Sequence, residues 1–555
     1  MIKKRYQRFE ETVLASTDEE IAAFFYSSFA LAQDPHSDYL SAQENERFDR
    51  ELKNQLTGIG AELATSPDGA TLVTGILVDG PAHRQGKLKP NDRIVAIDRL
   101  NNGSITDITF LPIQRVVSLI LGGKDTSIGL IIENRTPDDN QRKKVIIRRG
   151  NVKLKSAAAS AELVRIAQPS GPPRTLGWIT IPSFYLDFED GDPSVYNDVK
   201  RLVNRLKNEG VDGMALDLRN NGGGSLDEVP KLAGLFLPRG PIVQSRDNAR
   251  RIKTYASTQI RPAYDGPLVV VTDRNSASSS EILAGVLQDY NRAILVGEAS
   301  TFGKGTVQEK LGIANFLRFM QNPARAGDLK LTVQKFYRVT GSSTQLKGVV
   351  PHIILPSYND SLEIGERYLK YAMPHDVIQP APNFKPLPFR ELFLPFVAEQ
   401  SRQRVQSSAD FKYVRDDLVK AEGKRLKNLI SLNRQKRISE LAAEKEKTLT
   451  RNAERRSRFR KRQWRDSQQL HFLRLTLDDL DQTELKTVNR EKDSNDLILR
   501  APQGNEDFSE TPDWPSGIDP VQREAFAILE DMIVAKKDAA ELTELKNSIE
   551  NLSPQ

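Results

Sequence analysis

Residues 275–290 read NSASSSEILAGVLQDY, in which four serines precede an apolar run with helical spacing. Ser278 and Glu281 form the S-x-x-E pattern of a capping box, so one interpretation is that these serines only satisfy free amides at a helix start. The other interpretation is that one of them is a nucleophile. The residues on either side, and the motifs further along the chain, bear on this choice.

The stretch lies within a segment in which strand-like and helix-like patterns alternate. Its strand-like runs are LGWITI, GMALDL, PLVVVT and AILVG, and its helical patterns cover 195–208, 226–236 and 279–290. This alternation predicts an α/β core with a mostly parallel sheet, which we expect to span 173–375. The serines then fall in a strand-to-helix turn at the carboxyl edge of the sheet, where sites are commonly built.

Composition limits the chemistry that is available. The chain has 555 residues, of which 38% are hydrophobic and 28% charged, enough for about two to four domains. It has no cysteine, which excludes thiol catalysis and disulfides, and its five histidines show no metal-ligand spacing. We therefore expect neither a metal nor another cofactor. The sequence contains no run typical of a signal peptide or a membrane span.

Residues 46–150 predict a compact β-rich module with strands such as TLVTGILV, SIGLII and KKVIIRR. The turn formed by Gly58, Ile59, Gly60 and Ala61, followed by GPAHRQGKLKPNDRIVAID, resembles a PDZ domain. In such a module the turn offers backbone amides to a terminal carboxylate, and the strand after it pairs with an extended peptide. A linker at 151–172 is expected to connect this module to the core.

The two ends of the chain are predicted to be helical. Residues 1–45 have apolar side chains at helical spacing as far as a turn at Asp34. Residues 389–555, which follow a proline-rich linker at 376–388, are expected to form a highly charged helical domain, in a chain whose net charge is +6. Its most basic run, at 451–465, could bind phosphates, but neighbouring acidic residues favour a solvated helix face.

A nucleophilic serine needs a base, and histidine is the usual one. The nearest histidine in the sequence, His352, stands in no motif that would aim it at Ser278. Lys304 follows the strand-like run AILVG and has glycines on both sides, and burial can leave a lysine neutral. The spacing around Lys304 does not fit a Walker loop, because a glycine stands between the lysine and the next threonine.

Three glycines end another strand in DLRNNGGGSL, at 217–226. The amides of Gly222 and Gly223, together with that of Ser279, would supply an oxyanion hole. A flexible loop between a strand and a helix explains the glycines equally well when they are considered alone. The catalytic interpretation therefore depends on the serine and the lysine.

Five stretches together resemble the tail-specific, or C-terminal processing, family of serine peptidases. They are GIGAEL, DLRNNGGG, SASSSEILAGVLQDYNRAILVGE, FGKGTVQ and KFYRVTGSSTQLKGVVPHIILP, in the family's order and nearly its spacing. The charged helical end is similar to the C-terminal domain of the long periplasmic members. The resemblance implies a ClpP-like or crotonase-like protease core with an inserted PDZ domain.

Carried over by motif, the resemblance makes Ser278 the nucleophile, Lys304 the general base and Gln308 the residue that orients the lysine amine. Asp289 matches a position that supports the site. The loop from the serine to the lysine is one residue longer than is usual in the family. The long members also begin with a signal peptide and a further helical domain, so residues 1–45 are expected to be the remnant of a truncated N-terminal region.

The sequence thus predicts a serine endopeptidase that recognises unstructured, apolar C-terminal tails through its PDZ domain and cleaves by way of an acyl-enzyme. One alternative is a catalytically inactive peptide-binding scaffold. Another is a nucleic-acid-associated protein that uses residues 424–465. The resemblance also implies a periplasmic location and allows an adaptor lipoprotein as a partner.

Overall fold

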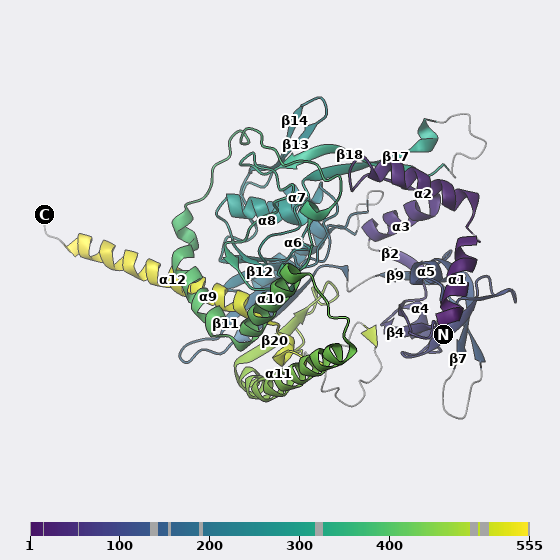
Figure 1. Cartoon of the computed structure of the whole chain (residues 1–555). Coiled ribbons are helices and arrows are strands. Elements are labelled where there is room, and N and C mark those ends of the chain that lie inside the picture. The colour runs from purple at the N-terminus through teal and green to yellow at the C-terminus, as the bar shows by residue number, and fades with distance from the viewer. Residues whose placement is uncertain are drawn as a thin grey trace.

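The computed structural model describes residues 2–14, 16–53, 55–133, 142–153, 157–187, 193–316, 326–488, 498–499 and 510–552. A central α/β body has the N-terminal helices and a β-rich module on one side, and helix α12 extends from the other (Figure 1). No helix in the described ranges combines the length and the apolar character needed to cross a membrane.

The body is built on a seven-stranded sheet in the order β19-β16-β15-β12-β11-β10-β20. Strands β19, β16, β15, β12 and β11 run parallel to one another. Strands β10 and β20 extend the sheet beyond β11 with antiparallel pairing. The parallel strands β11, β12, β15 and β16 lie where the sequence predicts strands, whereas the short parallel strand β19 was not predicted. The bounds are β10 (Ser160–Ile166), β11 (Arg174–Thr180), β12 (Gly213–Asp217), β15 (Leu268–Thr272), β16 (Ile294–Gly297), β19 (Ile353–Ile354) and β20 (Leu470–Leu475).

Both faces of this sheet are buried. Along β15, Leu268 and Val270 belong to one hydrophobic cluster, whereas Val269 and Val271 belong to another. Strands buried on both faces read as continuous apolar runs, which explains PLVVVT in the sequence. One face is covered by α6 (Val195–Asn208), α7 (Glu228–Ala233) and α8 (Ser279–Asp289), and the other by α9 (Leu394–Ser407) and α12 (Pro520–Leu552).

A second sheet joins the N-terminal segment to the body. Its order is β1-β18-β13-β14, with β17 also paired to β18. Residues 1–45, expected to be helical, therefore also supply a strand, because β1 pairs with β18. The elements are α1 (Ile2–Leu14), α2 (Asp18–Leu31), β1 (Asp38–Leu40), α3 (Ala42–Lys53), β13 (Gly240–Asp247), β14 (Ile252–Ser257), β17 (Thr306–Gly312) and β18 (Asp328–Tyr337).

The β-rich module has a hydrophobic core of its own. A two-stranded ribbon of β2 (Gln55–Gly58) and β9 (Gly150–Lys153) leads the chain into and out of it. A short strand from the C-terminal part, β21 (Ile498–Leu499), pairs with β4 of the module. The module contains β3 (Ala61–Thr65), β4 (Thr71–Leu77), α4 (Pro81–Gln85), β5 (Arg93–Asp98), β6 (Ile105–Asp107), α5 (Ile113–Ile120), β7 (Ser127–Glu133) and β8 (Arg142–Arg148).

Two expected boundaries differ from the structure. The stretch 151–172, expected to be a linker, contains β10, whose Ala161 and Leu163 face one core cluster and whose Val164 faces the other. The C-terminal part is not wholly helical, because β20 pairs with β10 and extends the core sheet. Its two further long helices are α10 (Ala409–Lys427) and α11 (Arg434–Gln469). Short 3₁₀ helices in the described ranges include Ile313–Asn315, Tyr358–Ser361, Glu366–Tyr368, Phe389–Leu392 and Pro515–Gly517.

Candidate active site

Ser278 occupies a strained turn between β15 and α8. Its backbone angles are φ 55° and ψ −114°, a region that residues other than glycine rarely adopt. In α/β-hydrolases a sharp turn from strand to helix presents a nucleophilic serine at the sheet edge. The backbone of this turn likewise departs from that of an ordinary helix N-cap, whose φ and ψ lie in the extended region.

The four serines of this turn differ in exposure and bonding. Ser278 is half-exposed, whereas the other three are buried. The hydroxyls of Ser276, Ser279 and Ser280 donate to the carbonyl oxygens of Leu218, Gly224 and Asn221, at 2.8, 3.0 and 2.9 Å. These three side chains fasten the turn to the glycine loop, which leaves Ser278 as the serine that a substrate can reach.

Glu281 joins the serine turn to the lysine loop. Its fully buried carboxylate accepts hydrogen bonds from the amides of Ser278 and Lys304 on Oε2, at 2.8 and 2.9 Å. On Oε1 it accepts from the Thr301 hydroxyl and the Gly303 amide, at 2.6 and 2.7 Å. Burial raises the pKa of Glu281 to about 7, although these four donors oppose the shift. The capping role expected for Glu281 is present, and it extends to the loop of the second candidate residue.

The Lys304 side chain lies in an environment that favours loss of its proton. Burial, and the like charge of Lys330, lower the pKa of Lys304 to about 8, while Glu366, Glu281 and Asp34 oppose the shift. An amine with this pKa is partly neutral near pH 8 and can act as a base. A lysine cation is strongly solvated in water. Burial removes that solvation, which is the physical reason why the neutral amine is favoured here.

The fold brings Ser278 and Lys304 to the same edge of the sheet. Strands β15 and β16 are parallel neighbours, and each residue follows the carboxyl end of one of them. Both backbone amides bind the same oxygen of Glu281, so the two nitrogens cannot be further apart than the sum of those two hydrogen bonds. No hydrogen bond joins Ser278 Oγ to Lys304 Nζ within the described residues. Catalytic contacts of this kind often form only when substrate is bound.

Gln308 and Asp289 lie in different surroundings. The Gln308 side-chain amide donates to the hydroxyls of Thr306 and Thr332, both at 3.0 Å, and not to the lysine amine. Asp289 lies at the far end of α8 and forms a bidentate ion pair with Arg338, at 2.6 and 2.9 Å. Asp289 therefore anchors the helix that carries Ser278 and does not touch the reacting groups.

The glycine loop packs directly against the serine turn. A Cβ on Gly223, which has φ 104°, would lie 2.8 Å from the Ser278 Cβ, so only glycine fits. The Gly223 amide donates to the Asn221 side chain at 2.9 Å. In the described part of the chain no acceptor binds the amides of Gly222 or Ser279. These two amides are available to an oxyanion, whereas that of Gly223 is occupied.

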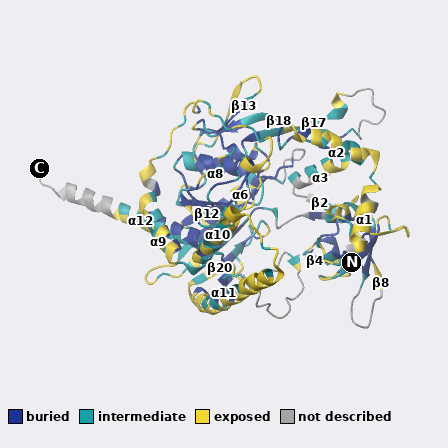
Figure 2. Ribbon diagram, in the orientation of Figure 1, coloured by how far each residue is buried: buried dark blue, intermediate teal, exposed yellow. Residues whose placement is uncertain are grey.

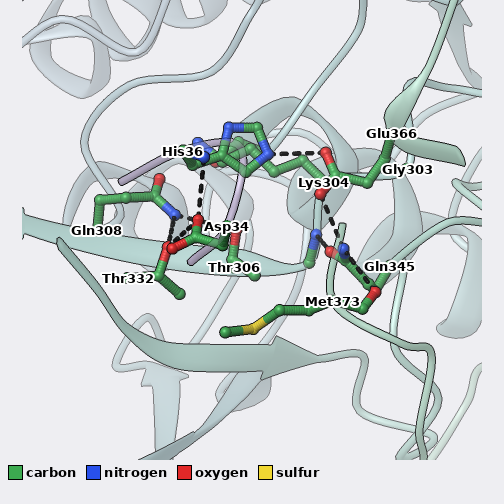
Figure 3. Close-up of polar contacts among 12 residues, drawn as sticks. Asp34, His36, Gly303, Lys304, Thr306, Gln308, Thr332, Gln345, Glu366 and Met373 are labelled. Carbon is green, nitrogen blue, oxygen red and sulfur yellow. Dashed lines mark hydrogen bonds and ion pairs between the residues drawn. The ribbon is translucent and has the colours of Figure 1, made fainter. Parts of the chain in front are cut away.

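Two residues of the N-terminal segment, Asp34 and His36, which were expected only near the end of a helix, lie on one side of Lys304 (Figure 3). The Asp34 carboxylate accepts from the Thr332 hydroxyl at 2.8 Å, and Nε2 of His36 lies 2.7 Å from Oε2 of Glu366. Gln345 links Glu366 to the lysine loop, because it donates to Glu366 at 2.8 Å and accepts from the Gly305 amide at 2.7 Å. The available signal was the polar run DPHS, residues 34–37, directly before the short strand β1.

Asp34 adds a negative charge to this network. Burial alone would favour its neutral form, but hydrogen bonds from Ser37 and Thr332 lower the pKa of Asp34 below its usual value. A carboxylate held ionised near the amine makes protonation of Lys304 easier and opposes the effect of burial. The pKa of Lys304 is therefore set by burial and Lys330, which lower it, against Glu366, Glu281 and Asp34, which raise it.

The predicted peptide-binding turn lies at the edge of the β-rich module. Gly60 has φ 73°, and a Cβ there would lie 3.1 Å from the Cα of Gly80. The carbonyl oxygens of Ile59 and Gly60 accept from Ala82 and Leu77, at 2.7 and 3.0 Å. Those contacts fix the turn, and Ala61 begins strand β3, which lies beside helix α5. Among the described strands β3 pairs only with β4, so its other edge can accept an extended peptide, as β-augmentation requires.

The described residues hold no cluster of histidine and carboxylate side chains suited to a metal ion. The pieces that are present are an accessible serine on a strained turn, a lysine with a lowered pKa, and unbonded amides beside the serine. Together they are features typical of a serine hydrolase site.

Comparison with known proteins relates the chain to a peptidase family. Residues 175–355 match peptidase family S41, and residues 359–534 match the C-terminal domain of tail specific protease. The core of the chain is thus similar to peptidase family S41, and the segment after it is similar to the C-terminal domain of tail specific protease.

Individual relatives agree with these matches. The chain is 33% identical over 442 residues to a tail-specific protease of Haemophilus influenzae, covering 79% of this chain and 61% of that protein. It is 28% identical over 363 residues to the carboxy-terminal processing protease CtpB of Bacillus subtilis, covering 64% and 68%. A solved photosystem II D1 C-terminal processing protease is 23% identical, with a TM-score of 0.36, covering 63% of this chain and 86% of that one. The chain thus spans less than two thirds of the Haemophilus protein's length.

Proposed function

We propose that the chain is a serine endopeptidase that cleaves proteins near unstructured, apolar C-terminal tails. The observation that carries the proposal is the binding of the Ser278 and Lys304 amides to one buried oxygen of Glu281. This contact aligns a strained, accessible serine with a lysine whose pKa is lowered to about 8. The names of the relatives support the same reaction class.

In the proposed mechanism, neutral Lys304 takes the proton of the Ser278 hydroxyl as its oxygen attacks the carbonyl carbon of the substrate. The amides of Gly222 and Ser279 hold the resulting oxyanion at the N-terminus of α8, where the helix dipole also favours negative charge. Protonated Lys304 then gives its proton to the leaving amine as the peptide bond breaks. Water releases the acyl group by the reverse use of the same lysine, which returns the proton to Ser278.

Gln308 has a conditional role in this proposal. A rotation of its side chain away from Thr306 and Thr332 would allow it to bind the lysine amine and orient it. The hydrogen bonds observed to the two threonines then represent a resting arrangement. The β-rich module would supply specificity, with Gly58, Ile59, Gly60 and Ala61 binding the terminal carboxylate and β3 pairing with the tail.

The family resemblance extends the proposal to a periplasmic enzyme for which an adaptor lipoprotein presents substrates. Neither a metal nor a nucleotide enters the proposed mechanism. The principal alternative is a peptide-binding scaffold without catalytic activity, since the module and the core fold independently of whether Ser278 reacts.

Cleavage of an unfolded protein with an apolar tail tests the proposal, with the parent, Ser278→Ala and Lys304→Ala compared in a buffer containing a chelator. Cutting by the parent alone, with all three proteins folded and able to bind a labelled tail peptide, is the expected result. If all three bind the peptide and none cuts, the scaffold alternative is correct.

A further inference from the structure

Helices α10 and α11 form an antiparallel hairpin that ion pairs hold along its length. Asp410 pairs with Arg458, and Asp417 pairs with both Lys447 and Arg451. The outermost pair between the two helices joins Lys420 and Glu444. The residues between that last pair, from 424 to 441, make the end of the hairpin, which we name the hairpin tip.

The hairpin tip exposes large apolar side chains. In its connecting loop Leu429, Ile430 and Leu432 are 87%, 76% and 99% exposed. Three more large apolar side chains in the flanking helical turns are also exposed, namely Leu426, Ile438 and Leu441. Figure 2 shows the loop and the adjoining part of α11 as almost wholly exposed. Isolated exposed leucines are common on protein surfaces, but six within eighteen consecutive residues form a patch that a partner would cover.

The same tip is strongly basic. From Lys424 to Arg437 the sequence contains six lysines and arginines and no carboxylate. Arg437 pairs with Glu440, and Arg425 lies near Glu422 at 3.9 Å. The other four cations, Lys424, Lys427, Arg434 and Lys436, have no ion-pair partner in the described part of the chain. The apolar patch is thus flanked by positive charge that the protein does not neutralise.

The exposed apolar side chains and the unpaired cations together indicate which kind of partner would bind the hairpin tip. A second copy of the tip would bring two sets of unpaired cations together, which repel each other. A bilayer with anionic headgroups instead attracts the cations, and its interface accepts the leucine and isoleucine side chains. Exposed apolar side chains also lie on α2, around Phe24 and Phe25, and on α1, around Phe9 and Leu14. The α2 sequence contains no lysine or arginine, and in the α1 sequence two glutamates accompany the cations, whereas the run from Lys424 to Arg437 contains no carboxylate.

We propose that the hairpin tip, residues 424–441, docks the protein on an anionic phospholipid membrane. The apolar side chains of the loop enter the headgroup region, and the lysines and arginines contact phosphate groups. The contact is peripheral, and it does not depend on the proposed peptidase activity. It would hold the C-terminal domain at a bilayer surface and restrict which protein substrates the catalytic core can reach.

Co-sedimentation with phosphatidylcholine vesicles, with and without phosphatidylglycerol, tests this proposal on the full chain at low salt. We expect binding that requires phosphatidylglycerol and weakens as salt is added. Replacing Lys427, Arg434 and Lys436 by glutamine should weaken partitioning by about 100-fold, at roughly fivefold for each cation near the surface. Replacing Leu429, Ile430 and Leu432 by serine should weaken it by at least about 100-fold. All six side chains are exposed, so these variants should fold as the parent does, which thermal unfolding checks.

Two matched controls distinguish the hairpin tip from a nonspecific effect of charge or hydrophobicity. In the first, Arg460→Gln, Lys461→Gln and Arg465→Gln together remove the same charge from exposed positions at the other end of α11. In the second, Phe24→Ser with Phe25→Ser removes exposed apolar side chains from α2. Both controls should bind vesicles as the parent does. The proposal is overturned if the parent ignores anionic vesicles, if the controls lose binding as much as the tip variants, or if the tip variants disrupt a self-associated form in sedimentation while vesicle binding is unchanged.

Discussion

Replacing Glu281 by glutamine should impair both the stability and the activity of the site, although it preserves the shape of the side chain. The carboxylate is fully buried and accepts four hydrogen bonds, two on each oxygen. Glutamine keeps one oxygen but turns an NH₂ group toward the donors on the other side. The hydroxyl of Thr301 can rotate to accept from that group, whereas the Gly303 amide cannot and loses its partner.

The expected loss follows from these contacts. One buried donor without a partner costs about 1–3 kcal/mol, and the remaining bonds are weaker because the acceptor is no longer charged, for a total of about 2–5 kcal/mol in the free energy of unfolding. Because the Ser278 and Lys304 amides share this carboxylate, part of the loss should appear in catalysis, where about 1.4 kcal/mol is tenfold in rate. We expect kcat to fall by about 100-fold, and Glu281→Ala, which orphans all four donors, to be worse.

The assay is steady-state cleavage of an unfolded, tailed substrate together with thermal unfolding of each variant. Glu309→Gln is the matched control, because Glu309 is exposed on β17, shortly after Lys304 in the chain. A Glu281→Gln protein with the parent's kcat and melting temperature would refute the view that this carboxylate aligns the serine with the lysine.

Four further outcomes follow from the site. Ser278→Ala should lower kcat by about 10⁴-fold or more, whereas Ser279→Ala, which removes only a buried bond to a carbonyl oxygen, should keep activity within about tenfold of the parent; similar values for both would undo the choice of nucleophile. The kcat/KM value should rise with pH and level off above about 8, because neutral Lys304 is the active form, and a profile that is flat between pH 6 and about 9 would exclude it as the base. Gly223→Ala should reduce kcat by about 100-fold, since its Cβ would lie 2.8 Å from that of Ser278, and an unchanged kcat in the folded variant would show that the loop can move aside. Asp289→Asn should lower the free energy of unfolding by about 1–3 kcal/mol and change kcat by less than about threefold, as measured by denaturant titration and kinetics; a large fall in kcat without loss of stability would place it in the chemistry instead.

The functional hypothesis could be reached from the sequence because its signals are local. The serine turn, the lysine between glycines and the glycine loop each follow an apolar run, and parallel strands place their carboxyl ends at one edge. The strand-and-helix order of the core was predictable for the same reason, since a strand buried on both faces is a continuous apolar run. Glu281 was visible as a helix cap, but its contacts with Gly303 and Lys304 were not.

The contacts between distant segments were decided only by the tertiary structure. Strand β1 pairs with β18 nearly three hundred residues away and brings Asp34 and His36 beside Lys304. Strand β10, hidden in an alanine- and serine-rich stretch, becomes a strand because β11 and β20 pair with both of its edges. Periodicity in a sequence reports which face of a segment is buried, but it does not report which other segment buries it, because that depends on packing and register across the whole chain.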